Sequence, residues 1–412
     1  MTQLKPGHTV DLLQSGQEYF AALMQAFDQA QREVWLETYI FNLDQSGIAV
    51  AEALERAAAR GVKVYLTMDG IGTPTLPPEW RERFERSGVH WSIFLPLGRI
   101  GVFIPSRWRR LHRKLCVVDG NVAFCGGINV LDDLFDPNHG KLTEPRLDFA
   151  VRVCGPLVGD VLEAMTHFWW RQQLSHEFDA HDFPAAWRSQ QLLLRRAARA
   201  MLGRGRDARG VPASAIQNTL GTARAGLLLR DNLRNRRKIE AAYLQAFSAA
   251  QSEIFVANAY FLPGARLRRA LINAARRGVR VRLLLQGRYE YFLQYHASRP
   301  VYGALLDAGV EIHEYAASFL HAKVAVVDSL WATVGSSNLD PLSLLMSREA
   351  NVMVLDEAFA VALKASLERA MAHGGKQLDA RLFGERSWLQ RVKERVAYSI
   401  MRFGLLLLGR RY

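Results

Sequence analysis

Two segments of the sequence carry the same chemically active side chains at the same spacing. In each segment a histidine is followed by a lysine, an aspartate, two small residues and an asparagine, in the pattern H-x-K-x4-D-x6-G-x-x-N. The first set is His112, Lys114, Asp119 and Asn129, and the second set, 209 residues later, is His321, Lys323, Asp328 and Asn338. A single occurrence inside a valine-rich hairpin is compatible with an ordinary core, but an exact repeat indicates a function.

These side chains suit chemistry at a phosphodiester. An imidazole has a pKa near 6.5, so one histidine can attack phosphorus while the other protonates the leaving alcohol and later deprotonates the incoming one. Lys114 and Lys323, together with Asn129 and Asn338, are expected to hold the phosphoryl oxygens as negative charge develops. This route requires neither a metal ion nor another cofactor.

Each half also offers a carboxylate that can orient a histidine through its second ring nitrogen. Asp148, in "RLDFAVRV", and Glu349, in "REANVMV", each follow the histidine of their own half by about 30 residues. The alternative is that both are surface carboxylates of an edge strand. Asp119 and Asp328 are predicted to support the site structurally within the catalytic motif, and the alternative is that they only form turns.

The two motifs make the chain similar to the phospholipase D superfamily, with "GGIN" in the first motif where "GSxN" is commoner. The stretches "LRDNLRNRRKIEAAYLQAF" and "VANAYFLPG" further resemble bacterial cardiolipin synthases of the short, B-like type, over roughly residues 8–372. The resemblance implies transfer of a phosphatidyl group from phosphatidylglycerol to a second phosphatidylglycerol, with release of glycerol. It also implies that His112 is the nucleophile and His321 the general acid and base, with the reverse assignment as the alternative.

The predicted helices and strands that must position these residues also occur as a repeat in the sequence. The segment that begins at Ala26 is echoed from Ala246, and each copy predicts a helix, a β-rich run, an amphipathic helix ending at a glycine (Gly61 and Gly278) and a strand. Alternation of strands and helices predicts an α/β fold with mainly parallel or mixed sheets. We therefore expect two pseudo-repeated α/β/α sandwich halves of the phospholipase D type that share one active site.

The repeat predicts four regions along the chain. They are an N-terminal half at residues 1–190, an Arg/Gly/Ala-rich linker or loop at 191–235, a C-terminal half at 236–375 and a basic amphipathic tail at 376–412. Because both motifs lie in one chain, a dimer is unnecessary to build the site, and no obligate protein partner is evident.

The composition favours an anionic partner. The net charge is +13, and the pI is near 9.9. The three cysteines form no CxxC pair and are expected to be small core residues in a reducing compartment. No run of apolar residues is long enough for a transmembrane helix. Because the family resemblance implies phospholipid substrates, we expect peripheral association with an anionic phospholipid membrane, on the cytoplasmic face of the bacterial inner membrane.

Two segments are candidates for the membrane contact. In the tail, apolar residues recur at helical spacing among arginines, namely Leu389, Val392, Val396, Ile400, Phe403 and Leu407. The segment from Ile93 to Arg110, with Phe103, Ile104 and Trp108, is the second candidate. The alternatives are a terminal helix docked on the protein body and a crossover loop packed inward.

Other functions remain as alternatives. Hydrolysis to phosphatidic acid uses the same intermediate, and a phosphodiesterase nuclease would use the positive charge, although no nucleic-acid partner is expected because aromatic stacking platforms are not evident. A non-catalytic binding module does not require two intact motifs. In "HEFDAHDF", His176, Asp179, His181 and Asp182 crowd together, but without ligand spacing typical of a metal site.

Overall fold

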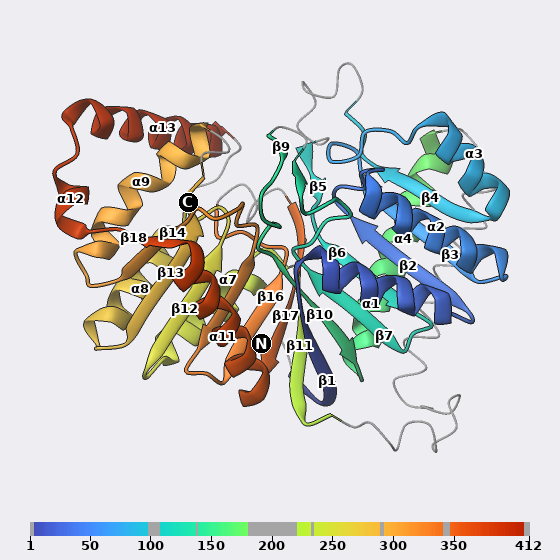
Figure 1. The fold of residues 1–412 in the computed structure, drawn as a ribbon, viewed down its shortest axis with the longest axis horizontal. Coiled ribbons are helices and arrows are strands. Elements are labelled where there is room, and N and C mark those ends of the chain that lie inside the picture. Colours follow the sequence, from blue (N-terminus) through green and yellow to red (C-terminus); the bar gives the residue numbers. More distant parts are fainter. Residues whose placement is uncertain are drawn as a thin grey trace.

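The computed structural model describes residues 4–97, 108–136, 139–179, 221–231, 235–288, 292–340 and 347–407. Within these residues, one mixed sheet of 16 strands runs through both halves of the molecule. Figure 1 shows the two halves side by side, with central strands of both halves next to one another in the middle of the molecule. The α/β fold with two repeated halves is therefore confirmed.

The N-terminal half consists of β1 (Lys5–Gln14), α1 (Ser15–Gln29), β2 (Glu33–Thr38), α2 (Gln45–Ala59), β3 (Lys63–Asp69), α3 (Pro78–Ser87), β4 (Val89–Phe94), β5 (Arg110–Leu111), β6 (Lys114–Val118), β7 (Val122–Gly126), β8 (Phe135–Asp136), β9 (Gly140–Lys141), β10 (Phe149–Cys154) and α4 (Leu157–Asp179).

The C-terminal half consists of β11 (Ala223–Arg230), α7 (Lys238–Ala249), β12 (Glu253–Asn258), α8 (Ala265–Arg276), β13 (Arg280–Gln286), α9 (Phe292–Leu306), β14 (Glu311–Tyr315), β15 (Lys323–Val327), β16 (Trp331–Gly335), β17 (Ser347–Leu355), α11 (Glu357–Gly374) and β18 (Gly375–Gln377). It ends with α12 (Ala380–Gly384) and α13 (Trp388–Leu407).

The strand order repeats about the centre of the sheet. From the middle outward, one half runs β1, β10, β7, β6, β2, β3 and β4, and the other runs β11, β17, β16, β15, β12, β13 and β14, with β18 at its edge. In both halves the outer three strands are parallel to one another and the inner hairpin is antiparallel. The two motif hairpins, β6–β7 and β15–β16, therefore occupy equivalent places.

Local sequence accounts for the repeated helices. α2 begins where Asp44 accepts a hydrogen bond from Gly47 N, and this side chain replaces a missing helical partner. After α2 and α8 the chain turns through Gly61 and Gly278, whose φ values of 87° and 89° favour glycine. Both amphipathic helices that the repeat predicts are thus confirmed, with their glycine stops.

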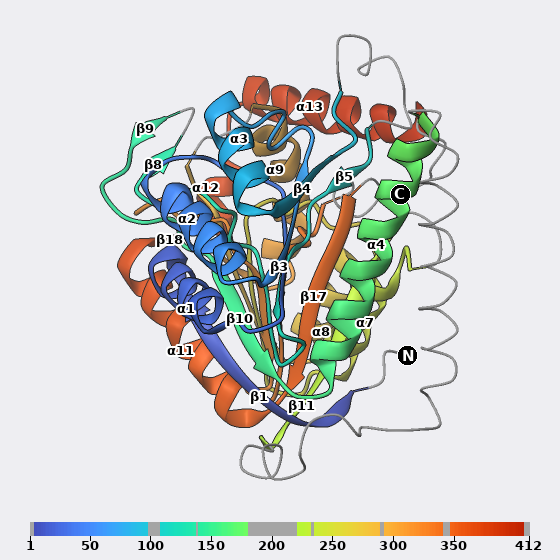
Figure 2. The same cartoon turned by 90° about the vertical axis from the view of Figure 1, so that its right-hand side faces the viewer.

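Three apolar cores hold these layers together. One lies between α1, α2, α3 and the N-terminal half-sheet, and a second lies between α7, α8, α9, α13 and the C-terminal half-sheet. The third, central core joins the facing sides of both half-sheets with α4 and α11, and Figure 2 shows these two helices on opposite sides of the central strands. Burial of this shared core fixes the position of one motif relative to the other.

Several sequence-based expectations need correction or completion. The predicted linker, residues 191–235, is wrong at its C-terminal end, because residues 223–230 form β11 in the centre of the sheet, where they pair with β17 and β1. Residues 191–220 and 232–234 lie outside the described residues. The three cysteines are free. Cys116 and Cys125 are buried in the core, as expected, whereas Cys154 is only half-buried.

Candidate active site

Each motif histidine is hydrogen-bonded to a carboxylate of the opposite half. His112 Nδ1 lies 3.0 Å from a carboxylate oxygen of Glu349, and His321 Nδ1 lies 2.6 Å from Asp148 Oδ2. The sequence analysis named both carboxylates without assigning a histidine to each, and the structure assigns each one to the histidine of the other half. The pairs cross between the halves, so one site is assembled from both.

Backbone contacts between the halves explain the crossing. His112 N donates to Arg348 O at 3.0 Å, where β5 runs parallel to β17, and His321 N donates to Leu147 O at 2.9 Å, beside a bridge between residues 147 and 320. In both cases the carboxylate is the residue that follows the backbone acceptor. In each half, a backbone hydrogen bond to the other half thus places the carboxylate beside the histidine of that other half.

The two lysines are buried beside these pairs. Lys114 is 2% exposed and Lys323 is fully buried. Lys114 Nζ donates to His112 O at 2.7 Å, and Lys323 Nζ donates to His321 O. Burial, and then the charge of Lys323, lowers the pKa of Lys114 from 10.5 to about 7. Two ammonium groups held this close favour the binding of an anion between them.

Burial also lowers the pKa of both imidazoles. For His112 the neighbouring Glu349 opposes this effect, whereas for His321 the charge of Lys323 adds to it and the pKa falls well below 6.5. Burial raises the pKa of Asp148 to about 6. With Nδ1 held by a carboxylate, the Nε2 atom of each neutral ring is the free nitrogen. Both rings keep some solvent access, with exposed side-chain fractions of 16% and 22%.

The residue that follows the motif glycine differs between the two halves. Ser336 Oγ donates to Glu349 Oε2, so a hydroxyl also holds the carboxylate that faces His112. The equivalent residue is Gly127, and a Cβ atom there would lie 2.3 Å from Asp148 Oδ1. The close approach of Asp148 therefore explains the glycine in "GGIN".

Asn129 and Asn338 are also buried, at 9% and 2% exposure. Asn129 Oδ1 accepts a hydrogen bond from Ile40 N at 3.2 Å, so its oxygen holds the loop after β2. Asn338 lies at the equivalent place after β16. Their binding of phosphoryl oxygens stays a prediction.

Asp119 and Asp328 lie at the other end of their strands from the lysines. Asp119 accepts hydrogen bonds from the backbone nitrogens of residues 31, 32 and 33, at 2.8–2.9 Å. Asp328 accepts the same three bonds from residues 251, 252 and 253. Both have positive φ values, 54° and 52°. They fasten the hairpin to the turn before β2 or β12. Although both belong to the catalytic motif, these contacts give them the structural role that the sequence predicts.

Sequence reasoning missed the pair that supports the backbone before each histidine. Asp69 Oδ2 accepts from Leu111 N at 2.7 Å, and Gln286 Oε1 accepts from Leu320 N at 3.1 Å. Asp69 and Gln286 are the last residues of β3 and β13. The signal was available, because both precede the final glycine of the aligned repeats, in "LTMDG" and "LLLQG".

The metal-site alternative gains no support from the described residues, among which no group of three or more histidine, cysteine, aspartate or glutamate side chains could hold an ion. His181 and Asp182 of the loop considered above lie outside the description, as do the side chains of His176 and Asp179.

The comparisons with known proteins agree with the geometry of the site. Residues 23–142 and 243–371 match the family model described as cardiolipin synthase, PLD-like domain.

Individual relatives match over nearly the whole chain. Cardiolipin synthase B of Escherichia coli K12 is 35% identical over 414 residues, which cover 98% of this chain and 90% of that protein. Probable cardiolipin synthase YwiE of Bacillus subtilis is 28% identical and covers 94% and 71%. The solved phosphatidylserine synthase of Haemophilus influenzae shares the fold, with a TM-score of 0.67 at 13% identity over 98% and 95% of the two chains. The chain belongs to the phospholipase D-like family of cardiolipin synthases.

Proposed function

We propose that this protein transfers a phosphatidyl group from one phosphatidylglycerol to another, which yields cardiolipin and glycerol. The observation that carries the proposal is the pair of crossed histidine–carboxylate hydrogen bonds beside two buried lysines. This arrangement offers two fixed imidazoles and a local positive charge for one phosphodiester. The relatives named cardiolipin synthase supply the substrate class.

The reaction has two balanced steps. In the first, His112 Nε2 forms a bond to phosphorus, the bond from phosphorus to the glycerol oxygen breaks, and His321 gives that oxygen a proton. In the second, His321 takes the proton of an acceptor hydroxyl, the new phosphorus–oxygen bond forms, and the phosphorus–nitrogen bond breaks. Lys114 and Lys323 stabilise the charge on the phosphoryl oxygens in both steps.

The asymmetry of the two pairs supports this division of roles. Glu349 accepts hydrogen bonds from Ser336 and from His112, so the His112 ring is held firmly, with Nε2 directed outward as a nucleophile requires. Asp148 lacks such a hydroxyl, and burial raises its pKa to about 6, so the carboxylate that faces His321 is less strongly stabilised in its charged form. An acid and base must exchange a proton in each turnover.

The membrane proposal rests on α13. No helix among the described residues is long and apolar enough to cross a membrane. Ala397 and Met401 of α13 are buried in the C-terminal core, whereas its other face exposes a row of apolar residues, namely Leu389, Val392, Val396, Ile400 and Phe403. The helix is thus both docked on the body and apolar outward. We propose that this outer face, the apolar face of α13, lies in the interface of an anionic membrane, on the cytoplasmic side of the bacterial inner membrane.

The second candidate for the membrane contact stays a prediction. Residues 98–107, with Phe103 and Ile104, lie outside the described residues. The side chain of Leu407 is also outside the description, whereas Trp108 is half-buried.

Product analysis tests the function. The purified protein is incubated with phosphatidylglycerol vesicles and a chelator, beside His112→Ala and His321→Ala. We expect cardiolipin and an equal amount of glycerol from the native protein, and a loss of at least about 10³-fold in both variants. Phosphatidic acid as the sole lipid product indicates a hydrolase instead, and cleavage of DNA without any lipid product indicates a nuclease. Either result overturns the proposal.

A further inference from the structure

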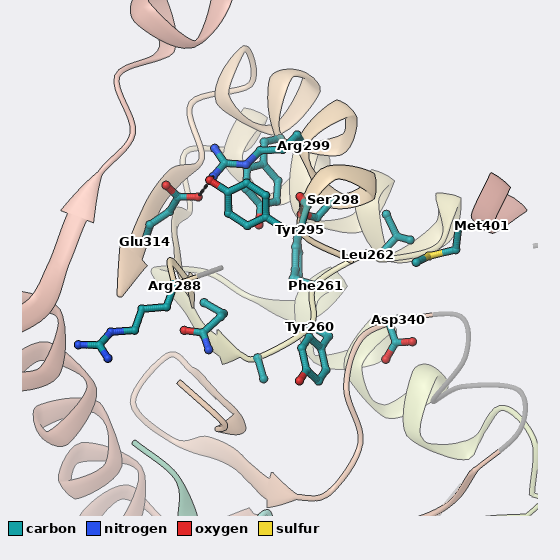
Figure 3. Close-up of a pocket in the computed structure, with 13 residues that line it drawn as sticks. Tyr260, Phe261, Leu262, Arg288, Tyr295, Ser298, Arg299, Glu314, Asp340 and Met401 are labelled. Atoms are coloured by element: carbon teal, nitrogen blue, oxygen red, sulfur yellow. Dashed lines mark hydrogen bonds and ion pairs between the residues drawn. The ribbon is translucent and has the colours of Figure 1, made fainter. Parts of the chain in front are cut away.

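A small recess of about 40 Å³, partly open to solvent, lies under α13 in the C-terminal half. Figure 3 shows Glu314, Arg299 and Tyr295 toward one end of it and Met401 toward the other, with Asp340 below. The walls come from α9, from the segment after β12 and from the residues after the second motif. Met401 of α13 closes one side.

This recess is attached to the second motif by backbone and side-chain contacts. Ala259 N donates to Ala322 O, next to His321, and Leu262 N donates to Leu339 O, next to Asn338. Asp340, in its wall, follows Asn338 by two residues. A ligand in the recess therefore lies against the segments that carry His321.

The two halves differ at the position where this recess begins. After β2, the ring of Tyr39 lies 4.9 Å from the ring of His112. The equivalent residue after β12, by the register of the two strands with their hairpins, is Ala259, which lines the recess. An aromatic ring thus lies against His112, whereas the equivalent residue in the other half, Ala259, carries only a methyl group. The two repeated halves therefore differ at the position that borders the recess, and such a difference is needed if the halves bind two different substrate molecules.

The lining favours a neutral, hydroxyl-rich group over a phosphate. Arg299 is paired with Glu314 at 2.6 Å, and Tyr295 OH accepts a hydrogen bond from Arg299. Asp340 adds a buried carboxylate, so the lining holds no excess of positive charge. Gln286 holds the second motif through Oε1, and its Nε2 atom has no hydrogen-bond partner among the described residues. Carboxylates, amides and phenols beside aromatic faces recognise polyols.

We propose that the recess binds the glycerol headgroup of the acceptor phospholipid, and that it presents the acceptor hydroxyl to His321. This inference rests on the proposed function. On this proposal, the C-terminal half binds the acceptor phospholipid. Helix α13 then forms a wall of the acceptor site and also contacts the membrane.

Isotopically labelled glycerol tests the proposal, because it is a polyol acceptor without acyl chains. Its incorporation into phosphatidylglycerol reports on acceptor binding, and phosphatidic acid reports on reaction of the same intermediate with water. Met401→Trp fills the recess from α13, and Ser399→Trp adds the same ring at an exposed position of the helix. We expect Met401→Trp to lower the ratio of exchange to hydrolysis at least ten-fold and to raise the KM for glycerol, while Ser399→Trp leaves both near the native values.

The outcomes separate this inference from the proposed function. A native protein that forms neither cardiolipin nor exchanged phosphatidylglycerol contradicts the proposed function. If Met401→Trp keeps the native ratio of glycerol exchange to hydrolysis, the inference is overturned. This holds also if only cardiolipin formation falls, because that result indicates that the recess binds an acyl chain and not the glycerol headgroup. If Met401→Trp loses all turnover, the nearly isosteric variant Asp340→Asn is measured in its place. We expect its KM for glycerol to rise several-fold, and an unchanged KM overturns the proposal.

Discussion

At the scale of single residues, the site depends on side chains that are costly to bury. His112, His321, Lys114 and Asp148 all have pKa values shifted by burial, and each shift disfavours the charged form. Without an anionic substrate the two ammonium groups repel each other. The fold tolerates this cost because the surrounding strands are buried and rigid, and an arriving phosphodiester relieves it.

Lys114→Met removes one of these buried charges. The native pKa of Lys114, about 7, lies below the ordinary 10.5, so the charge destabilises the fold fully below pH 7, and this cost fades as the pH rises toward 10.5. We expect the inactive variant to gain about 1–2 kcal/mol in the free energy of unfolding at pH 6, and less at pH 9. Urea unfolding at both pH values measures this gain. The exposed Lys393→Met is the control, and a loss of stability at pH 6 contradicts the account.

Gly127→Ser changes the first motif to the commoner "GSxN" sequence. Because the added Cβ atom would meet the Asp148 carboxylate at 2.3 Å, we expect it to displace the partner of His321 and to lower kcat about 10²-fold. The reciprocal Ser336→Gly removes a hydroxyl that donates to Glu349 and accepts from Ala350 N, and a loss of about ten-fold is expected. Vesicle assays of both variants, with circular dichroism as a check on folding, test this order. Equal activity of Gly127→Ser and the native protein would refute it.

At the scale of elements, the repeated hairpins were predictable from sequence and the pairing between them was not. The motif spacing predicts β6–β7 and β15–β16, and the turn residues Asp119 and Asp328 are local features. The crossing of Asp148 and Glu349 arises from backbone hydrogen bonds between residues about 170–240 positions apart, which leave no periodic pattern. Similarly, β11 escapes prediction because its alanine- and glycine-containing sequence follows a region typical of a linker.

The apolar face of α13 yields a prediction about membrane binding. Val396→Ser with Ile400→Ser removes two residues that are 52% and 55% exposed, so the fold should survive while interfacial burial is lost. We expect binding to anionic vesicles, measured by sedimentation, to weaken at least about ten-fold. Leu330→Ser with Val361→Ser is the matched control, because these residues are 48% and 47% exposed elsewhere on the surface. Equal weakening by both pairs rules out a specific role for α13.

At the scale of the whole molecule, the active site exists only because the two half-sheets share one core. The central core includes residues of both halves, such as Phe149 and Val352, and the first and second motifs meet across it. The repeat in the sequence predicted two halves and one site. The asymmetries that assign different tasks to the halves, Gly127 against Ser336 and Tyr39 against Ala259, became interpretable only with their neighbours in place.

The central claim is that the phosphatidyl group passes through His112. The native protein is mixed with phosphatidylglycerol vesicles, denatured during turnover at alkaline pH, and digested for mass spectrometry. We predict a phosphatidyl adduct on the peptide that contains His112, and no adduct in His112→Ala. An adduct on His321, or cardiolipin formation without any adduct, would contradict the account.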